Sequence, residues 1–434
     1  MTEDQRLTED QRQKAERVAR GLKRRYRAEK RFRLYGLMAV SFGILSVVVL
    51  FTDIISKGSG AFRQTYIQLE LHYDPEVIGV TDFGDPGAVA LGDYNGVIRA
   101  ALQQRFPELS TRNDRRELNR LISSGEGFDL RDRLVAHPEL LGRSEVRWLV
   151  ADDDIDTYFK SLRKRGDTFI GRVSGTLQTA IAHLQEHGDI ELQLNINFFT
   201  KGDSREPEQA GIWGAVAGSF FTLLITLALS FPLGVGAAVY LEEFAPKNRW
   251  TDLIEVNINN LAAVPSIIFG LLGLAIFINF FEVPRSIPVI GGLVLTLMTL
   301  PTIIISSRAA IKAVPPSIRE AAIGIGASPM QVVLHHVLPL AMPGMLTGAI
   351  IGMAQALGET APLLMIGMVA FIVDIPSGPT SPATVLPVQI FLWADSPERA
   401  FVEKTSAAIM VLLAFLIFMN TAAVWLRKRL ERRW

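Results

Sequence analysis

The chain contains no cysteine among its 434 residues, so no disulfide framework can hold it together. The dipeptide Gly-Lys never occurs, which excludes the phosphate-binding loop pattern Gly-x-x-x-x-Gly-Lys-Ser/Thr. We therefore expect no ATP binding through such a loop and no cofactor in this chain. Apolar residues dominate the chain: 49% of the residues are hydrophobic, and the mean hydropathy is +0.26. That composition is too apolar for a typical soluble enzyme and indicates a polytopic membrane protein.

Six uncharged or nearly uncharged runs are long enough to cross a bilayer. They cover residues 34–52, 211–240, 258–281, 287–307, 343–373 and 406–426. We predict a mainly α-helical membrane protein with six transmembrane helices. The first run is interpreted as a retained helix rather than a signal peptide, because no clear small-x-small cleavage site follows it.

Cations flank the apolar runs at both ends of the chain. The polar tail 1–33 concentrates its lysines and arginines between Arg20 and Arg33, and the tail 427–434 is also basic. A solvated helix or a nucleic-acid-binding arm are alternative interpretations of the first tail. Its position directly before a span favours a cytoplasmic anchor under the positive-inside rule. We expect both termini in the cytoplasm, a lipid bilayer as partner and no nucleic acid.

Residues 53–210 carry many charges and no spanning run, which predicts a soluble α+β insert between spans 1 and 2. Alternating apolar residues predict strands at Tyr66–His72 and Ile190–Phe198, paired so that the two ends of the insert meet near the membrane. Predicted helices lie near 94–106, 113–123, 152–164 and 168–186. The acidic run Asp152–Asp154 is interpreted as a helix start rather than a metal site. The insert shows no catalytic constellation.

The segment 317–343 lies between two spans and is not apolar enough to cross the bilayer itself. Ser317 and Glu320 have the spacing of a capping box, which predicts a short helix. Gly326 suits the positive φ that ends such a helix, and a second helix is predicted from Ser328 to the prolines at 339 and 343. His335 and His336 have no third ligand nearby in sequence, so we predict no metal site.

Glu359 is the only ionisable side chain inside the six predicted spans. An intramembrane carboxylate is costly and marks a candidate functional site. Gln355 lies one helical turn earlier, and Thr360 follows directly. Two interpretations stay open: these residues line a pathway or gate, or Glu359 only joins helices through a hydrogen bond or ion pair. A stripe of small residues on the same helix favours close helix contact. The stripe consists of Gly344, Gly348, Gly352 and Ala356.

The spacing in 317–343 resembles the EAA loop of ABC importer permeases. The matching positions are Glu320, Ala321, Ala322, Gly326, Leu338 and Pro339. The position usually apolar in that loop is His336, which departs from the pattern. The segments 261–270, 313–322 and 358–363 further resemble the PstA-type permease of the phosphate-specific ABC transporter. Gln355 stands where that family often has arginine, and the insert 53–210 is far larger than the family's usual outer segment.

The resemblance implies the type I ABC importer permease architecture, with a permease core over 211–426. It also implies a bacterial inner membrane protein that is not itself an enzyme. Expected partners are a second, PstC-like permease, a PstB-like ATPase dimer that holds ATP and Mg, and a periplasmic PstS-like phosphate-binding protein. The EAA-like loop would couple the chain to the ATPase, and Glu359 would pair with a partner arginine as a gate. Arg308 and Lys312, at the inner end of the fourth span, are candidate anion contacts.

Three alternatives differ in class or substrate. The chain could be the permease of an importer for another oxyanion, or a membrane receptor that senses through the insert. A receptor would need a cytoplasmic output module, and neither tail is long enough for a recognised one. An intramembrane enzyme would need a catalytic pair, whereas Glu359 is alone among the predicted spans.

Overall fold

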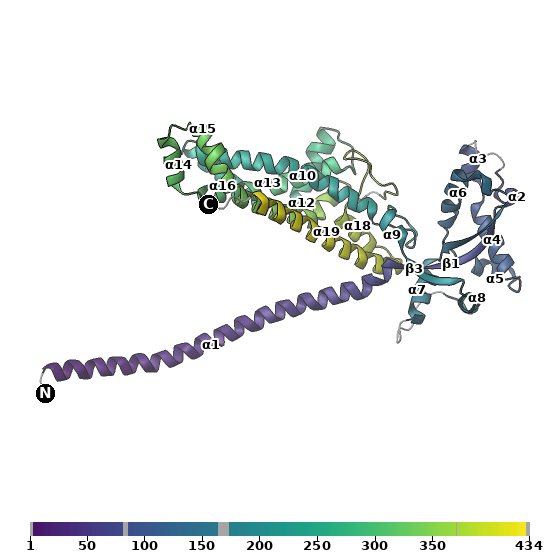
Figure 1. The fold of residues 1–434 in the computed structure, drawn as a ribbon, viewed down its shortest axis with the longest axis horizontal. Helices are drawn as coiled ribbons and strands as arrows, with labels where there is room; N and C mark the ends of the chain where they lie inside the picture. The colour runs from purple at the N-terminus through teal and green to yellow at the C-terminus, as the bar shows by residue number, and fades with distance from the viewer. Residues whose placement is uncertain (1–2, 81–85, 164–172, 370, 431–434) are drawn as a thin grey trace. The chain divides into compact units, whose positions relative to one another are not determined.

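The computed structural model describes residues 3–80, 86–163, 173–369 and 371–430. It divides into two units, Met1–Ser56 and Lys57–Trp434. Helix α1 (Glu3–Gly58) makes up the described part of the first unit (Figure 1). The stretch Arg25–Phe62 is long and apolar enough to cross a membrane and contains the predicted first span.

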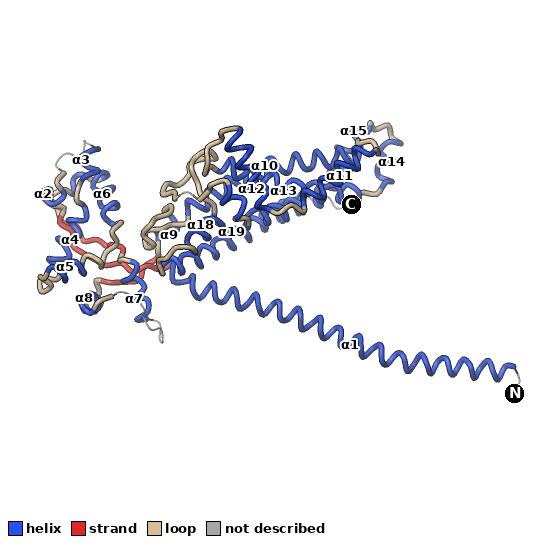
Figure 2. The backbone as a smooth tube through the Cα atoms, turned by 180° about the vertical axis from the view of Figure 1, so that it is seen from behind, coloured by secondary structure: helices blue, strands red, loops and turns tan. Residues whose placement is uncertain are grey.

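The second unit begins with an α+β insert, which has a three-stranded antiparallel sheet of order β2-β1-β3. Its strands are β1 (Arg63–His72), β2 (Ser144–Val150) and β3 (Ile190–Leu194), shown in red in Figure 2. In the central strand Ile67 lies opposite both Leu149 and Ile190. The pairing of the first and last strands of the insert is therefore confirmed.

One face of the sheet carries the hydrophobic core of the insert. Ile67, Leu69 and Leu71 alternate along β1 and are at most 3% exposed, because helices cover that face. The helices of the insert are α2 (Pro75–Ile78), α3 (Pro86–Leu91), α4 (Tyr94–Arg105), α5 (Arg112–Leu118), α6 (Glu126–Ala136), α7 (Asp153–Arg163) and α8 (Gly175–His187). Helix α4 begins where the Asp93 carboxylate accepts a hydrogen bond from the Gly96 N–H at 2.9 Å.

Several predicted bounds in the insert are wrong. The last strand stops at Leu194, because the Asn195 side chain accepts from the Phe198 N–H at 3.0 Å and starts helix α9 (Ile196–Thr200). Helix α5 ends at Leu118 rather than near 123. Of the predicted helix 168–186, residues 168–172 lie outside the described residues, and α8 begins at Gly175.

The rest of the second unit is a helical core. Its elements are α10 (Trp213–Val239), α11 (Arg249–Ala262), α12 (Ser266–Gly273), α13 (Pro288–Lys312), α14 (Pro316–Gly324), α15 (Pro329–Gln331), α16 (Leu338–Gly358), α17 (Ala361–Met365), α18 (Leu386–Ala394) and α19 (Ala400–Leu430). In the described part of the chain five helices are long and apolar enough to span, or six with the pair α11 and α12. That pair bends by 101° at a short break, so the predicted span 258–281 is not one continuous helix but a broken span or a re-entrant loop.

Small residues allow the central helices to approach closely. A Cβ atom added to Gly348 on α16 would lie 1.7 Å from the Ser306 Oγ of α13, and one on Gly344 would lie 2.6 Å from the Ala310 Cβ. A Cβ atom added to Gly234 of α10 would likewise lie 2.6 Å from the Ile303 Cγ2 of α13. The predicted small-residue stripe is thus the surface of α16 that contacts α13.

Figures 1 and 2 both show the insert at one end of the helical core and α14 and α15 at the opposite end. The two ends of the second unit therefore present different surfaces. The insert end displays a sheet with its helices, whereas the other end displays two short helices in the segment 317–343.

Candidate coupling site

The segment 317–343 forms two short helices joined by a glycine turn. Helix α14 begins at Pro316, a position that tolerates the missing N–H of proline. After the helix, Gly326 takes a φ of +91°, which side chains rarely adopt, so the predicted glycine turn is confirmed. Ser328 then starts α15 with a capping box, in which the Ser328 N–H donates to Gln331 Oε1 at 2.9 Å.

Two details of this prediction are wrong. Ser317 lies inside α14, after Pro315 and Pro316 have set the helix start, so the capping box belongs to Ser328 and Gln331 instead. Pro339 does not end the second helix, because a π-helical turn over Val332–Val337 leads directly into α16. A proline is tolerated where the regular hydrogen-bond ladder is already interrupted. The stretch Pro329–Gly358 is consequently one continuous candidate span.

The segment buries one side and exposes the other. Ala322 is 3% exposed and packs with Ile311, Val337 and Met345, where a larger side chain would not fit as closely. Glu320 and Ala321 are exposed, and Leu338 and Pro339 are half-buried. Ile323 and Ile325 are 59% and 82% exposed. We call the four exposed residues, three of them apolar and one a carboxylate, the coupling surface (Glu320, Ala321, Ile323 and Ile325).

Behind the coupling surface lies an ionic cluster that the sequence analysis missed. The Arg319 guanidinium donates to Glu243 Oε1 at 2.7 Å, and Arg308 donates to Glu242 at 2.5 Å and to Glu255 at 2.5 Å. Glu242 and Glu243 belong to a π-helical turn, Tyr240–Phe244, that extends α10 beyond its predicted end at 240. Two carboxylates directly after an apolar run were the signal that could have revealed this cluster.

The candidate anion contacts Arg308 and Lys312 lie in this cluster. The Arg308 side chain is 11% exposed and already bound to two carboxylates, whereas Lys312 is 63% exposed and lies 3.3 Å from Glu242. The helix around them runs to Lys312 rather than 307, so these cations occupy the end of a span. An anion arriving here would meet Glu242 beside both cations.

Glu359 lies just after a membrane helix, not inside one. Helix α16 ends at Gly358, and Glu359 has extended backbone angles of φ −77° and ψ 126°. Helix α16 ends there because the ring of Pro362 would clash with the carbonyl of Gly358 in a continuous helix. Glu359 and Thr360 are half-buried and Gln355 is exposed, so the break displaces Glu359 from the helical face that carries Gln355.

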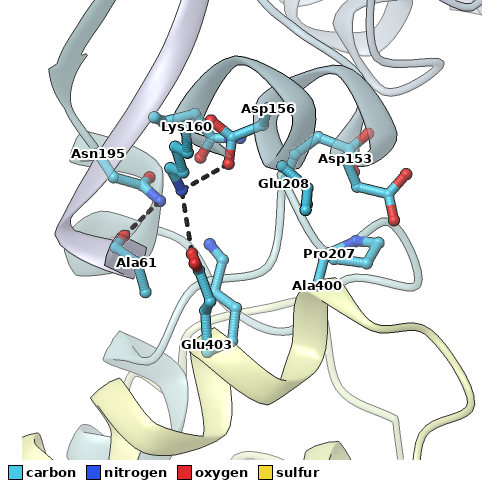
Figure 3. A pocket seen from close by; sticks show the side chains of 12 residues that line it. Ala61, Asp153, Asp156, Lys160, Asn195, Pro207, Glu208, Ala400 and Glu403 are labelled. Atoms are coloured by element: carbon cyan, nitrogen blue, oxygen red, sulfur yellow. Dashed lines mark hydrogen bonds and ion pairs between the residues drawn. The ribbon is translucent and has the colours of Figure 1, made fainter. Parts of the chain in front are cut away.

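At the opposite end of the core, buried charges join the insert to α19 (Figure 3). Lys160 of α7 lies 2.6 Å from Asp156 and 3.1 Å from Glu403 of α19, and its side chain is 12% exposed. Asp156 also accepts from the Thr65 N–H of β1 at 2.8 Å. Lys404, 5% exposed, donates to the Ala210 carbonyl at 2.9 Å. These contacts fasten sheet, helix and span together, and we call them the insert junction (Thr65, Asp156, Lys160, Glu403 and Lys404).

Carboxyl groups near the insert junction have altered acidity. Burial raises the pKa of Glu208 to about 8 and that of Glu126 to about 7. Glu208 is 3% exposed, and its Oε2 atom has no hydrogen-bond partner among the described residues. Burial beside the carboxylates Asp152 and Asp153 favours the protonated form of Glu208.

Comparison with known proteins assigns the class of the helical core. Residues 230–434 match the family described as "Binding-protein-dependent transport system inner membrane component". Together with the candidate spans, this match defines a multi-pass membrane transport subunit. Residues 19–167 match a domain of unknown function, DUF3333, which includes most of the insert.

Individual relatives resolve the family further. The chain is 32% identical over 248 residues to a probable ABC transporter permease protein, YqgI, of Bacillus subtilis, covering 54% of this chain and 83% of that protein. It is 31% identical over 215 residues to the phosphate transport system permease protein PstA of Yersinia pestis, covering 49% and 71%. The chain belongs to the ABC importer permeases of the PstA type, with a large N-terminal insert.

Solved structures also match the core. The match to a chain of an inward-facing MetNI methionine ABC transporter covers 51% of this chain and 98% of that chain, at 20% identity and a TM-score of 0.43.

A further sequence relative is the phosphate transport system permease protein PstA of Haemophilus influenzae. It is 29% identical to this chain, and the match covers 52% of this chain and 79% of that protein.

Proposed function

We propose that this chain is the permease subunit of an ATP-driven phosphate importer. It forms the translocation path with a second, PstC-like permease, and receives phosphate from a PstS-like binding protein. Support for phosphate comes from relatives that are named phosphate transport permeases, at about 30% identity. In this proposal the insert lies outside, and the coupling surface and both termini lie in the cytoplasm.

The observation that carries the coupling role is the coupling surface itself. Helix α14 lies at the end of the core opposite the insert (Figure 1); Glu320 is exposed on this helix, and Ile325, directly after it, is 82% exposed. An exposed apolar side chain next to a charge suits a groove on a partner protein. A PstB-like ATPase dimer, which holds ATP and Mg, would bind this surface. Its closure would move α14 as a rigid element and switch the core between inward and outward states.

Phosphate needs positive charge along its route. We propose that cations of the partner permease and helix N-termini supply most of it, with Lys312 as the more accessible of this chain's two candidate contacts. Glu359, followed by Thr360, would act as a gate against a partner arginine, and Gln355, exposed one turn earlier on α16, would line the pathway. Uptake that stays unchanged in Glu359→Gln would leave Glu359 a purely structural residue.

The test is radiolabelled phosphate uptake in cells that lack this chain. The cells are complemented with the wild-type chain, with Glu320→Arg, or with Glu186→Arg, a matched reversal at an exposed glutamate of the insert helix α8. We expect uptake with the wild type and Glu186→Arg, and little uptake with Glu320→Arg at equal membrane expression. Equal uptake with and without the chain would overturn the phosphate assignment. Competition by sulfate or molybdate instead of phosphate would favour another oxyanion.

A further inference from the structure

The ionic cluster behind the coupling surface connects it to the membrane helices. Arg319 and Glu320 are neighbours on α14, where successive side chains point about 100° apart. Glu320 is exposed, whereas the Arg319 side chain is only 23% exposed and points into the core. One residue thus faces the expected partner while the next faces the permease.

Arg319 connects α14 to two other helices. Its Nη2 donates to Glu243 Oε1 at 2.7 Å and to the Ile311 carbonyl at 3.0 Å, and its Nη1 donates to the Val314 carbonyl at 2.7 Å. Glu243 belongs to the extension of α10, and Ile311 to the last turn of α13. A guanidinium held by several acceptors in a fixed fork has little freedom to turn alone. Movement of α14 therefore has to displace the ends of α10 and α13.

The chain of contacts continues from Glu243 to its neighbour Glu242. Glu242 accepts from Arg308 at 2.5 Å, and Arg308 also binds Glu255 of α11 at 2.5 Å. The side chains of Arg308 and Glu242 are each 11% exposed, so salt and water screen their attraction weakly. Three cations (Arg308, Lys312 and Arg319) face three carboxylates (Glu242, Glu243 and Glu255), which leaves the cluster neutral.

We propose that the Arg319–Glu243 pair transmits movement of the coupling surface to α10 and α13, with the Arg308 contacts extending it to α11. These are positioning residues, because they act through the helices that they join. The proposal rests on the proposed coupling function but not on the identity of the substrate. A competing explanation is that the pairs only stabilise the folded core, so the test needs a readout that separates coupling from stability.

The experiment uses the full importer in proteoliposomes, and compares Arg319→Glu, Glu243→Arg and the double variant that exchanges both charges. Arg249→Glu, at an exposed arginine of α11, is the matched control. Measured quantities are co-purification of the ATPase, ATP hydrolysis stimulated by the binding protein, and substrate moved per ATP. We expect each single reversal to keep the assembly but lower transport per ATP by about tenfold. The double variant should recover part of the loss, because it restores the ion pair but not the hydrogen bonds to the Ile311 and Val314 carbonyls. The control should match the wild type.

Two results would overturn the proposal: normal transport per ATP in both single variants, or a double variant as defective as either single one. If Arg319→Glu does not assemble, Arg319→Lys and Arg319→Gln replace it. Lysine keeps the charge but loses the fork, so transport per ATP should fall in the order arginine, lysine, glutamine; equal values would overturn the proposal. If the wild-type importer moves no phosphate although the binding protein stimulates its ATP hydrolysis, only the substrate assignment fails, and transport per ATP is then compared for another oxyanion.

Discussion

The coupling end and the insert end of the core both contain buried or half-buried ion pairs, but they use them differently. At the coupling end, Arg319 and Arg308 join the ends of neighbouring helices, and Ile325, directly after α14, is 82% exposed. At the insert junction, Lys160 is 12% exposed, and joins a separate α+β domain to α19. The first arrangement lies beside a helix, α14, that is followed by an exposed apolar side chain. The second fixes one domain to one span, which suits a rigid attachment.

The largest difference between the two ends is expected when a substitution strains the turn at the coupling end. Gly326→Val would place a β-branched residue at φ +91°, which costs about 1–3 kcal/mol or displaces the turn. We expect uptake to fall by about tenfold or more while the ATPase still hydrolyses ATP. Measurement of uptake and hydrolysis in the same vesicles separates lost coupling from lost assembly.

Gly324→Ala is the matched control for that variant. Gly324 lies in α14, and a Cβ added there has no heavy atom within 4 Å. Uptake should stay near the wild-type level. A Gly326→Val protein that transports normally would mean that the turn can rearrange without cost, and that its shape does not set the position of the coupling surface.

A smaller effect is expected between the two ends, where α16 contacts α13. Gly348→Ala would place its Cβ 1.7 Å from Ser306 Oγ, and overpacking of this kind costs about 1–3 kcal/mol. We expect a melting temperature lower by about 5 °C in detergent. Gly236→Ala, at an exposed helical position with nothing within 4 Å, should leave the melting temperature unchanged or raise it slightly. Equal shifts in the two variants would contradict the close helix contact.

The smallest effect is a pH dependence confined to the insert end. The pKa of Glu208 is raised by burial from 4.5 to about 8, so the folded state favours its protonated form. That contribution to stability is complete below about pH 4.5 and is lost as the pH rises through about 8. Hydrogen exchange of β1 in the full chain should accelerate between pH 5 and 9, after correction for the intrinsic rate. Glu208→Gln should weaken this trend, leaving the part due to Glu126, whose pKa is raised to about 7. The exposed control Glu186→Gln should keep the full trend.

Local sequence patterns predicted the coupling end well. Spacing alone located the short helix, the turn at Gly326 and the small residues that contact α13. It did not reveal Arg319–Glu243, because the two residues are 76 positions apart and only the fold brings them together. The helix break after Gly358 was also missed, although Pro362 lies within one turn of it, because the apolar run continues across the break.

The insert end was predicted less completely. In strand β2, charged residues rather than apolar ones lie on the core side of the sheet, so the usual alternation does not mark the strand. Strand β2 places Glu145 and Arg147 opposite Leu71 and Leu69 on the core side of the sheet. Glu145 is paired with Arg133 of α6, whose Nε donates to it at 3.0 Å, whereas the buried Nη1 of Arg147 has no hydrogen-bond partner among the described residues. Its apolar residue Val146 lies on the other side and is 60% exposed. Lys160 and Glu403 of the insert junction are 243 positions apart, which no local pattern can connect.

The most direct test of the account asks whether the two ends lie on opposite sides of the membrane. The chain has no cysteine, so a single introduced thiol reports one position without background. Leu91→Cys on the insert and Ile325→Cys on the coupling surface replace side chains that are 88% and 82% exposed. With a membrane-impermeant thiol reagent in intact cells, the account predicts labelling of Leu91→Cys, and labelling of Ile325→Cys only after the membrane is opened and the ATPase removed. Equal labelling of both variants in intact cells, or labelling of Ile325→Cys alone, would contradict it.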